Sequence, residues 1–200
     1  GWVAGLQLAA LSLRGRDDAA AFVQAFAGDN RYIVDYLAEE VLQRQPAPVR
    51  RFLLQTAILD RLSAPLCDAV TGQNDSRQLL EALERGNLFV VPLDDKRHWF
   101  RYHHLFAEVL AAAMLQEQPA LVPTLHQRAS AWYAANDLPA EAIRHALAAN
   151  DFARAASLAE LVWPAMDGRF QAATWLGWAK AIPDEVVRAR PVLGVAYAWA

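Results

Sequence analysis

Two adjacent histidines, His103 and His104, are the residues of this chain that best suit chemistry on a ligand. They stand where an aromatic-rich segment, His98 to Tyr102, meets an apolar run with helical spacing that begins at Leu105. A strand-to-helix junction presents free backbone N–H groups and the positive end of the helix dipole, and both favour an anion. A histidine placed there can donate a hydrogen bond to a phosphate oxygen, and the nearby anion favours its protonated form.

A structural role is the alternative for this histidine pair. In that case one ring caps the helix and the other packs on Trp99 or Tyr102. Two arginines, Arg31 and Arg101, are possible further anion contacts, although each is also an ordinary arginine at the edge of an element. The residues alone leave both interpretations open.

Other polar and aromatic residues are expected to be structural. His126 and His145 lie within predicted helices and are expected to pack in the core or face solvent. Trp175 and Trp178 share a helix face at spacing i, i+3, so they belong to the core, the favoured interpretation, or line a concave binding surface. The single cysteine, Cys67, is flanked by apolar residues and is expected to be buried. No Cys/His spacing predicts a metal site.

The motifs that mark an active site are missing from the sequence. It contains no GxxxxGK followed by Ser or Thr, no GxGxxG and no GxSxG. The paired carboxylates at 17–18, 39–40 and 94–95 are expected to form a helix start, a solvated helix face and a turn. We therefore expect no catalytic site in this chain.

The composition indicates a folded chain. Of the 200 residues, 55% are hydrophobic and 20% are charged, which is enough to bury a substantial core. The formal net charge of −3 argues against a general nucleic-acid-binding surface, which usually carries a basic excess. Because no signal peptide or membrane-length apolar run is visible, we expect a cytoplasmic chain without membrane contact.

The elements around the histidines predict a winged helix. After a helix over Arg31 to Gln45, a second begins near Pro48, and a third is bounded by Ser63 as N-cap and Gly72 as C-terminal stop. A fourth is capped by Asp75 or Ser76 and stopped by Gly86-Asn87, and a hairpin with the turn Asp94-Asp95-Lys96 follows it. Three helices followed by a hairpin are the order expected of a winged helix.

The second half of the chain has a repetitive helical pattern. Helices are expected over Leu121 to Asn136, Pro139 to Asn150 and Phe152 to Val162, with alanine at close-contact positions as in tetratricopeptide-like hairpins. We expect a mainly all-α fold in three parts. Residues 1–45 end a helical domain, 46–118 form the winged-helix domain, and 119–200 begin a tetratricopeptide-like sensor region. Both chain ends lie inside uncapped helical runs, so we expect an internal segment of a longer protein.

Six stretches, taken in order, carry a family resemblance: GWVAGLQLAALSL, RYIVDYLAEEVLQRQPAPVRRFLLQTAILDRLSAPLCDAVTG, LEALERGNLFVVPLD, WFRYHHLFAEVL, LHQRASAWYAANDLPAEAIRHALAANDFARAA and RPVLGVAYAWA. The chain resembles the MalT-type, ATP-dependent regulators of the LuxR family of bacterial transcriptional activators. These belong to the wider class of signal-transduction ATPases with numerous domains. The resemblance covers essentially all 200 residues and places this chain after a domain with the phosphate loop and before a C-terminal helix-turn-helix.

The resemblance implies a nucleotide switch. ADP would hold a closed, monomeric form, whereas ATP and an inducer would favour self-association and promoter activation. The implied partners are the nucleotide-binding domain of the same protein and a small-molecule or protein inducer at the sensor region. This segment itself would not contact DNA. The full-length protein would bind ATP and hydrolyse it slowly, while this segment alone would bind nucleotide weakly or not at all.

Two sites are carried over from the resemblance. Gly1, Trp2 and Val3 occupy the place of a Gly-x-Pro motif that borders the adenine pocket, with valine in place of the proline. The segment from Tyr102 to Leu105 is similar to a Met-His-Asp-Leu motif whose histidine contacts the β-phosphate of ADP, and that histidine corresponds to His103. His104 stands where the family has the aspartate, so no carboxylate acts there.

Two other functions compete with this one. The chain could be a helical-repeat scaffold for protein interactions that binds no nucleotide, or its winged helix could bind DNA. The DNA reading is the weakest, because Arg77 and Arg85 of the expected recognition helix face a larger number of acids. A phosphate loop before this segment and a helix-turn-helix after it in the gene would decide for the regulator.

Overall fold

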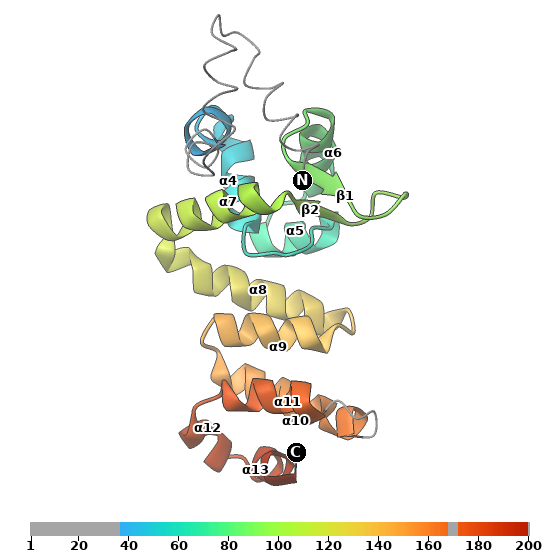
Figure 1. Ribbon diagram of the computed structural model, residues 1–200, viewed down its shortest axis with the longest axis vertical. Coiled ribbons are helices and arrows are strands. Elements are labelled where there is room, and N and C mark those ends of the chain that lie inside the picture. The colour runs from blue at the N-terminus through green and yellow to red at the C-terminus, as the bar shows by residue number, and fades with distance from the viewer. Residues whose placement is uncertain (1–36, 168–171, 200) are drawn as a thin grey trace, which may run out of the picture. The chain divides into compact units, whose positions relative to one another are not determined.

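A computed structural model describes residues 37–167 and 172–199 of the chain (Figure 1). The chain divides into two compact units, residues 1–119 (unit 1) and 120–200 (unit 2). The described ranges form helices and, in unit 1, one two-stranded sheet. The predicted class, mainly all-α with one small hairpin, is confirmed.

Unit 1 contains the helices and the hairpin in the order predicted for a winged helix. Its elements are η1 (Leu37–Leu42), α4 (Ala47–Thr56), α5 (Ala64–Thr71), α6 (Ser76–Arg85), β1 (Val90–Pro92), β2 (Phe100–Tyr102) and α7 (His104–Glu117).

The first element, η1, is a π-helix rather than an α-helix. Gln43 donates its backbone N–H to the carbonyl of Ala38, five residues earlier, at 3.2 Å. This is the hydrogen-bond spacing of a π-helix, which normally forms only short stretches. Where the sequence predicts the last part of a helix over residues 31–45, the structure therefore has a π-helix in place of an α-helix. The earlier part of that predicted helix lies outside the described residues.

Helix α5 begins and ends at the predicted residues. The hydroxyl of Ser63 accepts a hydrogen bond from the N–H of Leu66 at 3.4 Å, as an N-cap does. Gly72 ends the helix with a φ of 74°, a conformation that glycine adopts without steric cost.

Helix α6 also begins as predicted, but its capping interaction comes from elsewhere. Asp75 occupies the N-cap position, yet its side chain makes no cap bond within the described structure. Instead Asp68, at the middle of α5, accepts the N–H of Ser76 at 3.1 Å. This bond ties the start of α6 to the neighbouring helix.

The wing is the hairpin formed by β1, β2 and the turn between them. Its strands are antiparallel, with Val90 opposite Tyr102 and Pro92 opposite Phe100. On the other side of β2, Phe100 exchanges two backbone hydrogen bonds of 2.8 Å with Leu62, which precedes α5. Leu62 thus pairs with β2 like a one-residue third strand, and this bridge anchors the wing beside the start of α5.

Asp94 organises the tip of the wing. Its carboxylate accepts the backbone N–H of His98 at 3.0 Å and of Trp99 at 2.8 Å. These hydrogen bonds favour the charged form and lower the pKa of Asp94. Arg97 adopts a positive φ of 52° within the turn that they close.

In the core of unit 1, a buried polar contact joins the wing to α4. The hydroxyl groups of Tyr102 and Thr56 lie 2.6 Å apart, and Thr56 also donates to the carbonyl of Phe52 at 2.7 Å. Because Thr56 donates to Phe52, its oxygen accepts the phenolic proton of Tyr102. Burial strongly raises the pKa of Tyr102, so it remains a donor at neutral pH.

Replacing Tyr102 with phenylalanine is expected to lower the free energy of unfolding of unit 1 by about 1 kcal/mol, since one buried hydrogen bond is lost. Urea unfolding of the two chains measures the difference. Tyr197→Phe is the matched control, because Tyr197 is 39% exposed in unit 2. Equal losses in the two variants would show that the buried contact does not contribute.

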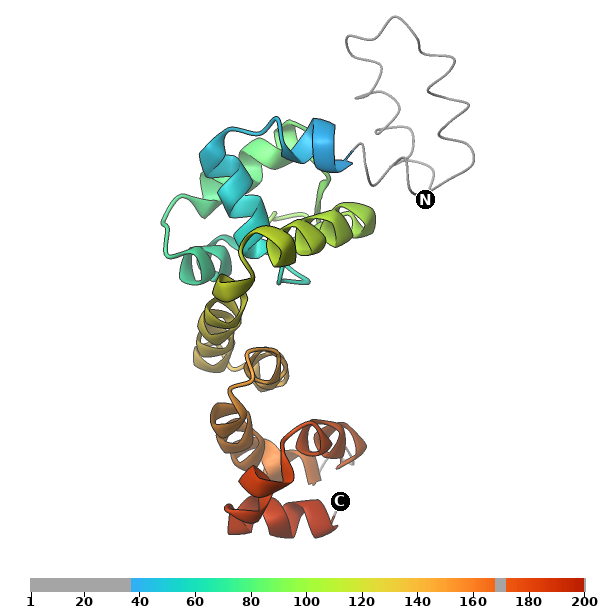
Figure 2. The ribbon, with the colours of Figure 1, turned by 90° about the vertical axis from the view of Figure 1, so that its left-hand side faces the viewer.

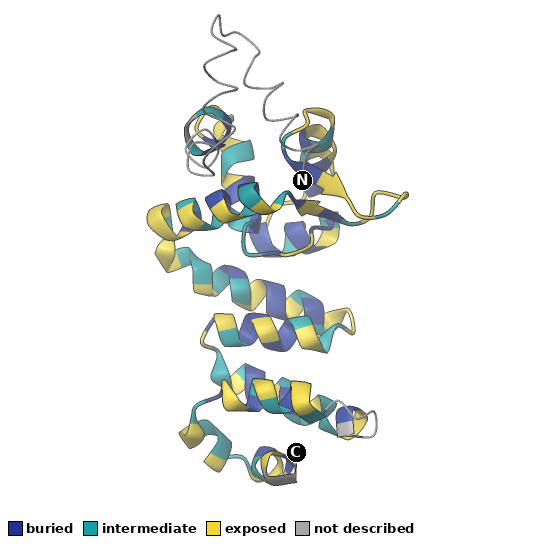
Figure 3. Ribbon diagram, in the orientation of Figure 1, coloured by how far each residue is buried: buried dark blue, intermediate teal, exposed yellow. Residues whose placement is uncertain are grey.

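Unit 2 is a succession of helices along the chain (Figures 1 and 2). After the short η2 (Pro119–Leu121) its elements are α8 (Val122–Ala135), α9 (Pro139–Ala148), α10 (Phe152–Asp167), α11 (Ala172–Lys180), α12 (Asp184–Arg188) and α13 (Pro191–Trp199). Helix α9 packs against both α8 and α10. Buried residues gather where α8 and α9 face each other (Figure 3).

Trp175 lies at the centre of the core that α10 and α11 share. It is fully buried, and its indole N–H donates to the carbonyl of Ala159 at 2.8 Å. The ring of Trp163 lies 4.7 Å from it. Trp178 packs against the same cluster but remains partly exposed. The favoured core interpretation is therefore confirmed for Trp175.

Within residues 37–167 and 172–199, no single helix combines the length and the apolar character that a membrane crossing needs.

Candidate functional site

His103 joins β2 to α7, and its backbone is held on both sides. Its N–H donates to the carbonyl of Phe89 at 2.7 Å, which extends the wing ladder by one pair. Its own carbonyl accepts the N–H of Ala107 at 2.9 Å, the first hydrogen bond of α7. The strand and the helix thus fix the position from which the imidazole projects.

The imidazole of His103 has an unused polar atom. Its Nδ1 is buried and has no hydrogen-bond partner among the described residues. His103 occupies the N-cap position of α7, but its side chain makes no cap bond in that part of the structure. The ring lies beside that of His104, with centroids 4.3 Å apart, whereas Tyr102 packs edge-on against Phe106. His103 therefore does not take the predicted capping role.

The surroundings of His103 favour the neutral form of its ring. Burial lowers its pKa, and the neighbouring His104 and Arg101 lower it further. Negative charge at the same position acts in the opposite direction, so a bound phosphate raises this pKa. The first-turn N–H groups of α7, which no described side chain caps, point to the same region. The junction can therefore accept an anion chemically.

Arg101, one of the two arginines predicted as anion contacts, lies close enough to affect His103. It is exposed on β2, two residues before the histidine. The other predicted residues, Gly1, Trp2, Val3 and Arg31, lie outside the described residues. The adenine-pocket prediction for residues 1–3 stays a prediction.

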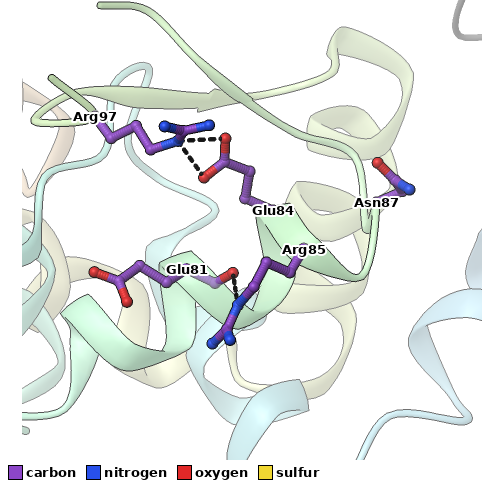
Figure 4. Close-up of a pocket in the computed structure, with 5 residues that line it drawn as sticks. All are labelled: Glu81, Glu84, Arg85, Asn87 and Arg97. Carbon is purple, nitrogen blue, oxygen red and sulfur yellow. Dashed lines mark hydrogen bonds and ion pairs between the residues drawn. The ribbon is translucent and has the colours of Figure 1, made fainter. Parts of the chain in front are cut away.

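A separate polar pocket of about 590 Å³ lies between the end of α6 and the wing (Figure 4). Arg97 donates from Nε to both carboxylate oxygens of Glu84, at 2.8 and 3.0 Å. Arg85 donates from Nε to the backbone carbonyl of Glu81 at 3.2 Å. Arg97 and Glu84 thus neutralise each other, so this pocket offers little net positive charge to attract a polyanion such as DNA.

Two further arrangements have no local signal in the sequence. Glu84 and Arg97 are 13 residues apart and meet only because the wing folds back over α6. His126 and His145, on α8 and α9, form a hydrogen-bonded pair. Neither is a metal centre, and among the described residues no group of three or more His, Cys, Asp or Glu side chains is placed to hold a metal ion.

Comparison with known proteins identifies the domain that contains this junction. Residues 38–122 match the family described as the MalT winged helix domain. The match includes η1, all elements of unit 1 after it, and the start of α8.

Curated relatives match a longer part of the chain. The serine/threonine-protein kinase PknK of Mycobacterium tuberculosis is 38% identical over 200 residues, which is 100% of this chain and 18% of that protein. The HTH-type transcriptional regulator MalT of Klebsiella pneumoniae is 40% identical over 153 residues, 76% of this chain. MalT of Yersinia pestis is 41% identical over the same length. The chain spans 17–18% of the length of these relatives.

Proposed function

Residues 38–122 of this chain belong to the MalT winged helix domain family, and on that premise we propose that the chain is the regulatory and sensor segment of an ATP-dependent bacterial transcriptional activator. In this proposal the segment has no catalytic site of its own. It couples the nucleotide state of a neighbouring domain to inducer sensing by unit 2 and to self-association. ADP stabilises a closed form, and ATP with inducer stabilises an open one.

The observation that carries this proposal is the free Nδ1 of His103. A buried polar atom without a partner costs free energy unless something binds it, so an unpaired imidazole nitrogen at a helix N-terminus is suited to contact an anion. In its protonated form, Nδ1–H donates to a phosphate oxygen of ADP while the α7 amides face the same charge. ADP would thereby fasten the wing to the nucleotide-binding domain.

Replacing His103 with alanine tests the proposal in a protein that carries this chain beside a phosphate-loop domain. Loss of one charge-assisted hydrogen bond is expected to weaken ADP binding roughly 10- to 100-fold. It should also raise activity without inducer, because the closed form is less favoured. Isothermal titration calorimetry measures the affinity, and His98→Ala, at the exposed wing tip, is the matched control.

The pH dependence gives a second signature of the same contact. The pKa of His103 is lowered when free and raised by phosphate, so ADP binding takes up a proton. Affinity for ADP should therefore fall as pH rises through the pKa of the bound state, and this dependence should vanish in His103→Ala. Unchanged ADP affinity and an unchanged pH profile in the variant would exclude the contact.

A second candidate is the regulatory segment of a protein kinase. It is favoured by the relative PknK, a serine/threonine-protein kinase by name, which matches 100% of this chain. The two candidates share the regulatory segment and differ in the domain that it controls. Sequencing the complete gene separates them, because a kinase domain supports one and a helix-turn-helix supports the other.

A further inference from the structure

A hydrogen bond between two histidines joins α8 to α9 in unit 2. The Nδ1 atoms of His126 and His145 lie 2.8 Å apart, and the ring centroids are separated by 5.0 Å. His145 is fully buried, and its ring stacks on Tyr133 at 5.3 Å with an interplanar angle of 17°. His145 thus lies inside the interface of the two helices, and His126, which is half-buried, reaches it from α8.

A neighbouring arginine determines where the protons lie. Arg144 places Nη2 3.4 Å from Nε2 of His145, and a guanidinium can only donate. Nε2 of His145 is therefore the acceptor, and the ring carries its proton on Nδ1. That proton is donated to Nδ1 of His126, whose own proton must then lie on Nε2. In this arrangement both rings are neutral. Arg144 donates to His145, and His145 donates to His126.

The charges that act on this pair are cationic. Burial lowers the pKa of His145 to about 3, with Arg144 and His126 adding to the effect. Burial and then Arg144 also lower the pKa of His126. Besides the two histidines, the charged or titratable groups among the described side chains of the three helices that pack here are Arg128 and Tyr133 on α8, Glu141 and Arg144 on α9, and Arg154 and Glu160 on α10.

The carboxylates among these groups do not offset the cations. Glu160 is paired with Arg190, and Glu141, one turn before His145, is not among the groups that shift either pKa. Arg154 donates from Nε to the hydroxyl of Ser130. A positive charge on the histidine pair would therefore have no described anion to stabilise it.

We propose that the His126–His145 hydrogen bond is a proton-sensitive catch that holds α9 against α8 and opens when the pair binds one more proton. An added proton must bring two N–H groups head to head, either between the two rings or between His145 and Arg144. In both cases a hydrogen bond becomes a repulsive contact inside a buried interface. The catch lies in the helical unit, and it works whether or not the protein binds nucleotide.

The stability of the α8–α9 contact should therefore fall in acid. Both pKa values are lowered in the folded state from an ordinary value of 6.5, so the stabilisation is present above pH 6.5 and is lost as pH decreases below it. For His145 alone, the equilibrium constant for opening is expected to rise about 30-fold between pH 7.5 and pH 5.0. A contribution from His126 would increase this factor.

Hydrogen exchange of the full 200-residue chain, corrected for intrinsic rates, measures opening of α8 and α9 at the two pH values. The double variant His126→Leu/His145→Leu removes both titrating rings and is expected to reduce the pH response to about threefold or less. The control His98→Gln removes an exposed wing histidine and should keep the wild-type response. A wild-type chain without the response, or a double variant that keeps it, would overturn the proposal.

Long-range ¹H–¹⁵N NMR of the wild-type chain provides a test that needs no variant to fold. At pH 7.5 it should find the proton of His145 on Nδ1 and that of His126 on Nε2, with both rings neutral. A proton on Nε2 of His145, or a ring that titrates near pH 6.5, would contradict the arrangement.

Discussion

Unit 2 is expected to lose about 3–5 kcal/mol of unfolding free energy when Trp175 is replaced with alanine. The side chain is fully buried between α10 and α11, and its removal leaves a cavity that the surrounding helices can fill only in part. The carbonyl of Ala159 also loses the indole N–H that it accepts at 2.8 Å. Loss of packing and loss of a buried hydrogen bond therefore act together.

Urea unfolding, with hydrogen exchange in α10 and α11 as the local readout, measures this effect. Leu161→Ala is the matched control, because Leu161 lies on α10 but is 77% exposed and should change stability by less than about 0.5 kcal/mol. If the tryptophan variant loses less than about 1 kcal/mol of unfolding free energy, the helices of unit 2 must move inward and fill the cavity.

In unit 1, Phe106→Ala is expected to have an effect of similar size, about 3–5 kcal/mol. Phe106 is fully buried in the first turn of α7, and its ring centroid lies 5.4 Å from that of Phe89 and 5.9 Å from that of Tyr102. It fixes the start of α7 against both strands of the wing region. Its loss should therefore loosen the junction at His103 as well as the core.

The unfolding of unit 1 measures the first effect, and the NMR signal of the His103 ring measures the second. Leu115→Ala, on the same helix but 61% exposed, is the control for both. If the ring signal of His103 is unchanged while the core is destabilised, Phe106 supports the fold without positioning the histidine.

Local signals account for the parts of the fold that were predicted best. A serine before Pro65 and a glycine at residue 72 bound α5, because capping and a positive φ depend on residues adjacent in sequence. The aromatic and β-branched composition around residues 88–102 likewise indicated the wing. In such stretches the sequence neighbours are also the physical neighbours.

Interactions between distant residues could not be predicted in the same way. The carboxylate that binds the start of α6 belongs to Asp68 and not to the adjacent Asp75, because the packing of α5 on α6 brings it there. The π-helical turn of η1 has no strong compositional signal. His126 and His145 are 19 residues apart, and only the pairing of two helices brings their rings together.

The candidate site was predicted in part. The position of His103 at the strand–helix junction follows from the change in periodicity at that point. Its buried Nδ1 and its lowered pKa depend on the packing of the wing against α7. The sequence pattern predicts the secondary-structure position of a residue. The burial and the protonation of its side chain depend on which other elements pack against it.

The register of the wing has a consequence for how copies of this domain meet. The backbone N–H of Leu93 donates to the carbonyl of Trp99, and the N–H of His103 donates to the carbonyl of Phe89. Because hydrogen-bonded pairs alternate along an antiparallel ladder, the backbone N–H and C=O groups of Val90 and Pro92 face away from β2. Pro92 has no N–H, and the outward edge of β1 therefore presents a single donor, that of Val90. Such an edge is a poor template for a further strand. We therefore expect no sheet-to-sheet growth toward fibrils from this edge when copies of the domain are crowded together.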